Sequence, residues 1–141
     1  MENKLIFMPI FGQVALTFMI WVWLYVTRLS TMARDRIDPQ VLADESGYAL
    51  LRKVAGPSDN FENLFELPVL FFALGVSIIV SGKSDPWFGV WMWGFVWLRA
   101  LHSIIHCTYN RITHRFVAYF LSSLILWGLW VRLFLKIAIG G

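Results

Sequence analysis

Two charged side chains stand in apolar segments of this chain that are long enough to cross a membrane, and both could bind a polar ligand there. Glu66 lies in the apolar run from residue 64 to residue 80, and Arg99 lies in a second run that continues to Asn110. An acid at the centre of a membrane helix costs about 2.5–3.5 kcal/mol, so it is retained where it faces protein or water. The two charges therefore predict a polar site between helices.

The spacing of the polar residues around Arg99 places them on one face of a helix. At about 100° per residue, an arc of roughly 100° holds Arg99, His102, Ser103, His106 and Asn110. On the preceding segment, a similar arc holds Glu62, Asn63 and Glu66. The connection that follows contributes Arg111 and Arg115. These faces predict a cavity, open to the cytoplasm, for an anionic or zwitterionic ligand; the alternative is a structural network in which the same groups satisfy one another.

His102 and His106 are four residues apart, which is also the spacing of two metal ligands on one helix. A third ligand would have to come from His114, Glu66 or another chain. The chain has three His and a single cysteine, Cys107, so neither a di-iron centre nor a cysteine metal cluster is expected. Metal and haem ligation stay as alternatives. Hydrogen bonding to a ligand is the preferred role, and no metal is expected.

Four apolar stretches must position these residues. The chain has 141 residues, of which 58% are hydrophobic and 15% are charged, whereas soluble domains have about 25% charged residues. Each stretch is close to the roughly 20 residues that cross about 30 Å of hydrocarbon. The predicted helices are residues 5–26, 60–80, 87–106 and 116–139. The expected fold is an all-α, integral membrane four-helix bundle that forms a single domain over residues 1–141.

Capping signals predict where the second long helix begins. Asp59 and Glu62 have the spacing of a capping box, which favours a start near Asn60. Gly56 and Pro57 are expected to end a short helix that precedes it.

Two prolines interrupt the predicted helices. Pro9 and Pro68 each remove a backbone hydrogen bond and predict kinks, the second of them beside Glu66. Gln13 and Thr17, four residues apart, are expected to help the first helix pack.

The basic residues set the expected orientation. One side of the membrane would hold Arg28, Arg34, Arg36, Arg52, Lys53, Arg111 and Arg115. The other side would hold Lys4, Lys83, Arg132 and Lys136. Because an excess of Lys and Arg is retained in the cytoplasm, both termini are expected on the non-cytoplasmic side. The sequence is compatible with a bacterial inner membrane or an endoplasmic reticulum membrane, and its compactness favours the bacterial one. The first helix lacks a cleavage site and is expected to be retained. Topology explains the net charge of +3, so no nucleic-acid partner is expected.

These residues resemble those of the MAPEG superfamily, the membrane-associated proteins of eicosanoid and glutathione metabolism. Members similar to microsomal glutathione transferase open the second of four helices with an Asn, a Glu three residues on and then a Pro. Asn63, Glu66 and Pro68 match that order, with the Pro one or two residues early. Their third helix has an Arg and, seven positions later, an aromatic residue, and a second Arg precedes helix four. The residues at these places are Arg99, His106 and Arg115, with His106 where the family usually has Tyr.

The resemblance implies a homotrimer with glutathione, as co-substrate, bound between neighbouring subunits on the cytoplasmic side. The residues that would bind it are Asn63, Glu66, Arg99, His102 and His106. Arg115 would be the catalytic residue that stabilises the glutathione thiolate. The second substrate would be a hydrophobic electrophile reached from the membrane lipid: a lipophilic halide, epoxide, enone or lipid hydroperoxide.

Two classes of function remain open from the sequence. The first is a glutathione-dependent transferase or peroxidase. The second is a non-catalytic lipid-binding protein or an accessory subunit of a larger membrane complex. The chain departs from the family where a basic residue usually precedes the Asn, because Pro57, Ser58 and Asp59 stand there and Arg52 and Lys53 lie further upstream.

Overall fold

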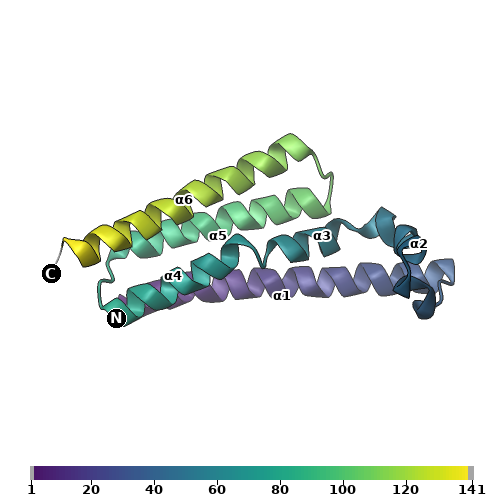
Figure 1. Ribbon diagram of the computed structural model, residues 1–141, viewed down its shortest axis with the longest axis horizontal. Coiled ribbons are helices and arrows are strands. Elements are labelled where there is room, and N and C mark those ends of the chain that lie inside the picture. The colour runs from purple at the N-terminus through teal and green to yellow at the C-terminus, as the bar shows by residue number, and fades with distance from the viewer. Residues whose placement is uncertain (1, 140–141) are drawn as a thin grey trace.

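The computed structural model describes residues 2–139, which are helical almost throughout and form a bundle of four long rods (Figure 1). In chain order the elements are α1 (Glu2–Asp35), η1 (Pro39–Ala43), α2 (Glu45–Tyr48), η2 (Ala49–Val54), α3 (Gly56–Asn63), α4 (Leu67–Ser81), α5 (Pro86–Cys107) and α6 (Ile112–Ala138). The segments long and apolar enough to span a membrane are Lys4–Asp35, Gly56–Ser81, Pro86–Cys107 and Ile112–Ala138. The predicted all-α membrane bundle is therefore confirmed.

The ends of the helices gather at the two ends of the bundle. α1 begins and α6 ends at one of them, which we call the terminal end (Figure 1). The segment from η1 to η2 and the turn between α5 and α6 lie at the opposite end, which we call the loop end. The basic residues that the sequence assigned to the cytoplasm belong to the loop end.

The first helix is longer than its apolar stretch predicted. The prediction ended it at residue 26, but α1 continues through Pro9 and onward to Asp35. Its 34 residues span about 51 Å, more than the roughly 30 Å hydrocarbon core. The hydroxyl of Thr27 donates to the carbonyl of Trp23 at 2.8 Å, so this polar residue is accommodated inside the helix. Arg36, with φ of 52°, lies just past the end of α1 in the left-handed conformation typical there.

The second long helix begins earlier than the capping signal predicted. α3 starts at Gly56, and Pro57 lies in its first turn, where the missing N–H of a proline removes no helical hydrogen bond. The amide of Asp59 already bonds to the carbonyl of Ala55 at 2.8 Å, so Asp59 is inside the helix and is not its cap. The predicted start near Asn60 is therefore wrong, because Gly56 and Pro57 open this helix instead of ending the one before.

The same span is broken in its middle, as the proline predicted. α3 ends at Asn63 and α4 begins at Leu67, and the two rods are visibly separate (Figure 1). Pro68 has no N–H to donate to the carbonyl of Leu64, so a continuous helix cannot pass this point without losing a bond. Glu66 occupies the cap position of α4 with φ of −90° and ψ of −102°. The break therefore places Glu66 outside regular helix.

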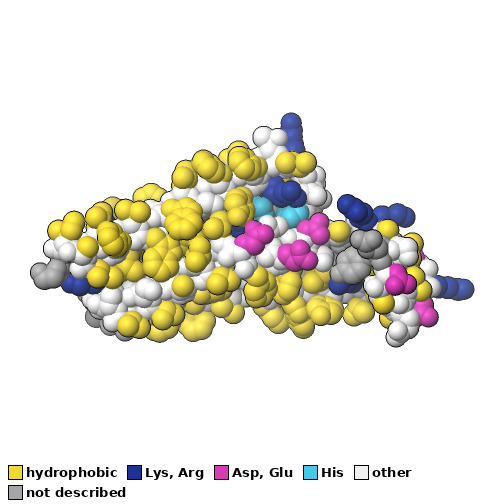
Figure 2. All heavy atoms as spheres, viewed as in Figure 1, with side chains coloured by type: hydrophobic (Ala, Val, Ile, Leu, Met, Phe, Trp, Pro, Cys, Tyr) yellow, Lys and Arg dark blue, Asp and Glu magenta, His cyan; other side chains and the backbone are white. Residues whose placement is uncertain are grey.

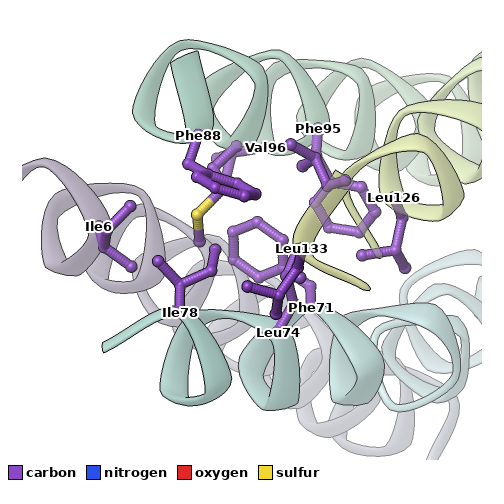
Figure 3. Packing of buried hydrophobic residues seen from close by; sticks show 11 residues of the cluster. Ile6, Phe71, Leu74, Ile78, Phe88, Phe95, Val96, Leu126 and Leu133 are labelled. Atoms are coloured by element: carbon purple, nitrogen blue, oxygen red, sulfur yellow. The ribbon is translucent and has the colours of Figure 1, made fainter. Parts of the chain in front are cut away.

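Buried apolar side chains from all four spans form the core towards the terminal end (Figure 3). The labelled members are Ile6, Phe71, Leu74, Ile78, Phe88, Phe95, Val96, Leu126 and Leu133. Phe71 and Phe95 stack with ring centroids 4.6 Å apart, joining α4 to α5. A smaller cluster of Leu16, Ile20 and Leu64 lies nearer the loop end. Gln13 stands between the two clusters along α1 and is fully buried, and its side-chain amide has no partner among the described residues.

Asp85 connects the start of α5 to the end of α6 through a hydrogen bond and ion pairs. Its Oδ1 accepts the N–H of Phe88 at 3.1 Å, and its Oδ2 accepts from Arg132 at 2.7 Å and contacts Lys136. Partial burial raises the pKa of this carboxyl, but hydrogen bonds from Lys136, Arg132 and Phe88 outweigh burial and hold the pKa at about 2. The ion pair therefore joins two spans at the terminal end.

We expect Asp85→Asn to lower thermal stability near neutral pH, because the amide keeps the helix cap but loses both cationic partners. Arg132 is 41% exposed, so solvent screens part of the attraction and the expected loss is about 1 kcal/mol. The folded pKa lies below the ordinary 3.8, so this contribution is present above pH 3.8 and is lost as pH falls towards 2. In detergent, the unfolding temperatures of wild type and Asp85→Asn should converge at low pH. A difference between the two unfolding temperatures that stays constant down to pH 2 would contradict this role of Asp85.

Candidate functional site

Charged and imidazole side chains gather midway along the bundle. Figure 2 shows acidic, basic and His side chains side by side on this face, with many apolar side chains on the spans around them. The residues predicted for the site come from the end of α3 (Asn63), the break before α4 (Glu66), α5 (Arg99, His102 and His106) and α6 (Arg115). Three separate spans therefore contribute to this region.

Arg99 is the innermost of these residues, and its side chain is fully buried. One terminal nitrogen donates to the backbone carbonyl of Asn63 at 2.7 Å. In an unbroken helix that carbonyl would accept the N–H of Leu67, so Arg99 satisfies an acceptor that the break releases. Nε and the other terminal nitrogen of Arg99 are buried without a partner among the described residues. The guanidinium therefore retains donors for a further acceptor.

Glu66 lies in the break between α3 and α4 and is exposed. Its carboxylate interacts electrostatically with Arg99 and with the hydroxyl of Tyr119. Two groups lie close to the ring of Tyr119. The guanidinium carbon of Arg99 is 5.3 Å from the centre of that ring, and the centre of the His102 ring is 5.8 Å from it. Sequence reasoning missed Tyr119. Its position four residues after Arg115, on the same face of α6, is the signal that could have indicated it.

His102 is held in one tautomer by the backbone of α6. Its Nδ1 is 3.1 Å from the carbonyl oxygen of Arg115. A carbonyl only accepts, so Nδ1 carries the hydrogen and Nε2 is left as an acceptor. His102 is 2% exposed, and its Nε2 has no partner among the described residues. The site therefore contains a buried imidazole nitrogen that can accept a hydrogen bond.

His106 is fixed in the same tautomer by Arg115. The guanidinium of Arg115 donates to Nε2 of His106 at 2.8 Å and to the side-chain oxygen of Asn110 at 2.9 Å. Arginine only donates, so Nε2 of His106 accepts and Nδ1 carries the hydrogen. Nδ1 is buried without a partner among the described residues. Asn110 adopts φ of 46°, a conformation that Asn tolerates well, at the turn that joins α5 to α6.

The side chain of Asn63 is engaged within its own helix. Its amide nitrogen donates to the carbonyl of Asp59 at 2.8 Å, so only its backbone carbonyl meets Arg99. Asn60, one turn earlier and fully buried, accepts the hydroxyl of Ser103 at 3.3 Å and joins α3 to α5. The sequence reasoning did not include Asn60 in the site, although it lies three residues before Asn63 on the same face.

The two His of α5 do not assemble a metal centre in the described part of the chain. Their rings are 5.5 Å apart and nearly perpendicular. His114, considered as a third ligand, lies 3.2 Å from the hydroxyl of Tyr109. Among the side chains that the structure describes, no three His, Cys, Asp or Glu come together as metal ligands. The arrangement is instead one of hydrogen-bonding groups around a buried cation.

A known protein family matches this chain. Residues 6–135 match the model of the MAPEG family. Neither the curated proteins nor the solved structures contain a match to this chain. The family match covers nearly all of the sequence. The chain therefore belongs to the MAPEG family.

Proposed function

We propose that this membrane protein binds glutathione between Arg99 and Arg115 and uses its thiolate as a nucleophile. The observation that carries the proposal is the fully buried Arg99, two of whose nitrogens have no partner among the described residues, within electrostatic reach of the exposed Glu66. A buried cation with spare donors favours an anionic acceptor, because leaving those donors without partners is costly. Membership of the MAPEG family agrees with a role in glutathione chemistry.

The charges of the site complement those of glutathione. Arg99 offers donors for a carboxylate of the tripeptide, and Glu66 offers an acceptor for its ammonium group. His106 and Asn63 would supply further hydrogen bonds at the same level of the bundle. A zwitterionic peptide therefore fits this arrangement better than an apolar ligand does.

Activation of the thiol needs only a modest electrostatic contribution. A free thiol has a pKa of about 8.5, and lowering it by two units takes about 2.7 kcal/mol. One cation about 4 Å away supplies roughly 4 kcal/mol at an effective dielectric constant of about 20. Arg115 is the cation that we assign to the sulfur.

The thiolate would then react with an electrophile that enters from the lipid. With a lipophilic halide, a carbon–sulfur bond forms as the carbon–halogen bond breaks and halide leaves. With a lipid hydroperoxide, two glutathione molecules are oxidised to the disulfide, while the peroxide is reduced to an alcohol and water. Both reactions use the same nucleophile, so the site supports a transferase or a peroxidase.

We also propose that glutathione is enclosed by neighbouring subunits of a homotrimer, as the family resemblance implied. Large apolar side chains remain exposed along α1 and α6, among them Phe11, Phe18, Phe116 and Phe134. These faces are available to lipid and to other subunits. We place the loop end in the cytoplasm of a bacterial cell, because its excess of Arg and Lys favours retention there.

Calorimetric titration of the detergent-purified protein with glutathione tests this proposal. We expect saturable binding that Glu66→Gln weakens about tenfold or more, since the substitution removes a charge-assisted hydrogen bond. Glu62→Gln is the matched control, because Glu62 is exposed one turn earlier on α3 and should leave the affinity unchanged. Equal affinities in all three proteins, or no binding by the folded wild-type protein, would contradict the proposal.

A non-catalytic lipid-binding protein or accessory subunit is the second candidate. The observation that favours it is the engagement of Arg115 with both His106 and Asn110, which uses donors that a thiolate would need. In that case lipid or partner proteins should co-purify in mild detergent, and glutathione should produce no turnover. A lipid-free, active oligomer would count against this candidate.

A further inference from the structure

A shallow groove runs along one side of α6 at the terminal end. Its volume is about 590 Å³, and it is lined by one stripe of that helix: Gly128, Val131, Arg132, Leu135, Lys136 and Ile139. From its first residue to its last the stripe rises about 17 Å, close to half of the roughly 30 Å hydrocarbon core. Arg115 lies at the opposite end of α6, so the groove shares no residue with the glutathione site.

Two cations of the groove are held in place by residues at the start of α5. Arg132 donates to Asp85 at 2.7 Å, and Lys136 contacts the same carboxylate. The guanidinium carbon of Arg132 is 5.4 Å from the centre of the Phe88 ring, and Nζ of Lys136 is 5.6 Å from it. Asp85 is the cap residue of α5, so both cations lie at the level where the third span begins. Because a span begins near the membrane surface, this is the level of the lipid headgroups.

The two cations outnumber the acid that they share. Asp85 supplies one negative charge, and the side chains of Arg132 and Lys136 are still 41% and 33% exposed. A guanidinium has five N–H donors and an ammonium has three, so each keeps donors for a further acceptor. Because Asp85 and Phe88 already fix their positions, an anion would bind with little cost of ordering two long side chains. The groove therefore favours a negatively charged group at this level.

Gly128 leaves the deeper part of the groove open. A Cβ at this position would have no packing neighbour within 4 Å among the described residues. Glycine destabilises a helix interior relative to alanine, and close approach of another span of this chain does not explain it here. Val131 and Leu135, next along the stripe, are exposed. This surface therefore suits an apolar chain that lies directly against the helix.

Charge distinguishes a lipid from a neighbouring subunit as the occupant. Another copy of this chain would need a spare carboxylate at the level of the two cations. Of the nine Asp and Glu of the chain, all except Glu2 and Asp85 lie from Asp35 to Glu66, and Asp85 is already paired. A phospholipid instead supplies a phosphate at the membrane surface and an apolar chain beneath it, which is the arrangement of the cations and the open groove.

We propose that this groove binds one anionic phospholipid, with its phosphate against Arg132 and Lys136 and one acyl chain along Gly128, Val131 and Leu135. Basic residues among membrane helices bind anionic headgroups in this way. An uncharged lipid would leave the excess positive charge without a partner, and a soluble anion would leave the apolar stripe uncovered. The site does not depend on the proposed glutathione chemistry.

Native mass spectrometry of the detergent-purified protein, titrated with phosphatidylglycerol or phosphatidylcholine, tests the proposal on the full chain. We expect one phosphatidylglycerol per chain to bind about tenfold or more tightly than phosphatidylcholine. Arg132→Gln/Lys136→Gln should weaken that binding about tenfold or more, since two charge-assisted contacts are removed. Lys4→Gln/Lys83→Gln is the matched control. It removes the same charge from the terminal end outside the groove, so its affinity should stay within about twofold of wild type.

Two further variants separate the loss of the cations from general damage. Asp85→Asn breaks the same ion pairs but keeps both cations, so the folded variant should retain the lipid. Gly128→Leu keeps the ion pairs but fills the groove, and should weaken phosphatidylglycerol binding about tenfold or more. Equal affinity for the two lipids, equal weakening by both double variants, or loss of the lipid in folded Asp85→Asn overturns the proposal. So does dissociation of the oligomer in Gly128→Leu, which would assign this face to a neighbouring subunit.

Discussion

Replacing Arg115 with alanine is expected to lower glutathione-dependent turnover about twentyfold at neutral pH. A thiol with a pKa of about 6.5 is roughly three-quarters thiolate at pH 7, whereas one at about 8.5 is only about 3% thiolate. The loss of the cation that we assign to the sulfur should return the pKa of the thiol to about 8.5, so that little thiolate remains at pH 7. The measurement is conjugation of a lipophilic aryl halide by detergent-purified protein.

Two controls separate this effect from general damage. Arg111→Ala removes the same charge four residues earlier, from an exposed residue at the start of α6, and should retain full turnover. Arg115→Lys keeps a cation and should retain more activity than the alanine variant, with the deficit smaller at high pH, where the thiol ionises unaided. Equal turnover in Arg115→Ala and wild type, with the oligomer intact, would remove Arg115 from the mechanism.

Replacing Arg99 with methionine is expected to abolish glutathione binding and to destabilise the protein by roughly 1–3 kcal/mol. The buried carbonyl of Asn63 would lose its 2.7 Å donor, and an unsatisfied buried acceptor costs about that amount. Methionine keeps much of the volume of the side chain, so little of the loss would come from a cavity. Glutathione titration and thermal unfolding of the same preparation measure the two effects.

The helix break provides a specific test of this explanation. Pro68→Ala restores the N–H that a continuous helix needs, so the carbonyls of Asn63 and Leu64 could return to helical hydrogen bonds. Arg99→Met should therefore cost less stability in a Pro68→Ala background than in wild type, while glutathione binding stays lost. If the destabilisation by Arg99→Met is the same in both backgrounds, Arg99 does not stabilise the break as we infer.

Much of the fold could be predicted from hydrophobicity, because a membrane span is specified by its length and apolar content. The residues at which the helices begin and end were harder to predict. α1 continues past its apolar stretch, since polar residues such as Thr27 satisfy their hydroxyls on the helix backbone and nothing before Arg36 stops the helix. The start of α3 was misplaced because Gly56 and Pro57 can end one helix or open the next, and local sequence does not decide between these roles.

Sequence reasoning could predict the charged residues of the site, because an apolar segment ordinarily excludes charges. Glu66 is close enough to interact electrostatically with Arg99, and His102, His106 and Arg115 form one hydrogen-bonded group. Tyr119 and Asn60 were missed because tyrosine and asparagine within helices are unremarkable by type alone.

The most direct test of the central claim is an ultraviolet difference spectrum of the purified protein titrated with glutathione near neutral pH. We expect a saturable thiolate absorbance that is present in wild type and in Arg111→Ala and is lost in Arg115→Ala. If the protein is folded and oligomeric but shows no thiolate signal at saturating glutathione, the thiol is not activated at this site. The protein would then be a non-catalytic member of its family, to be studied through its lipids and partners.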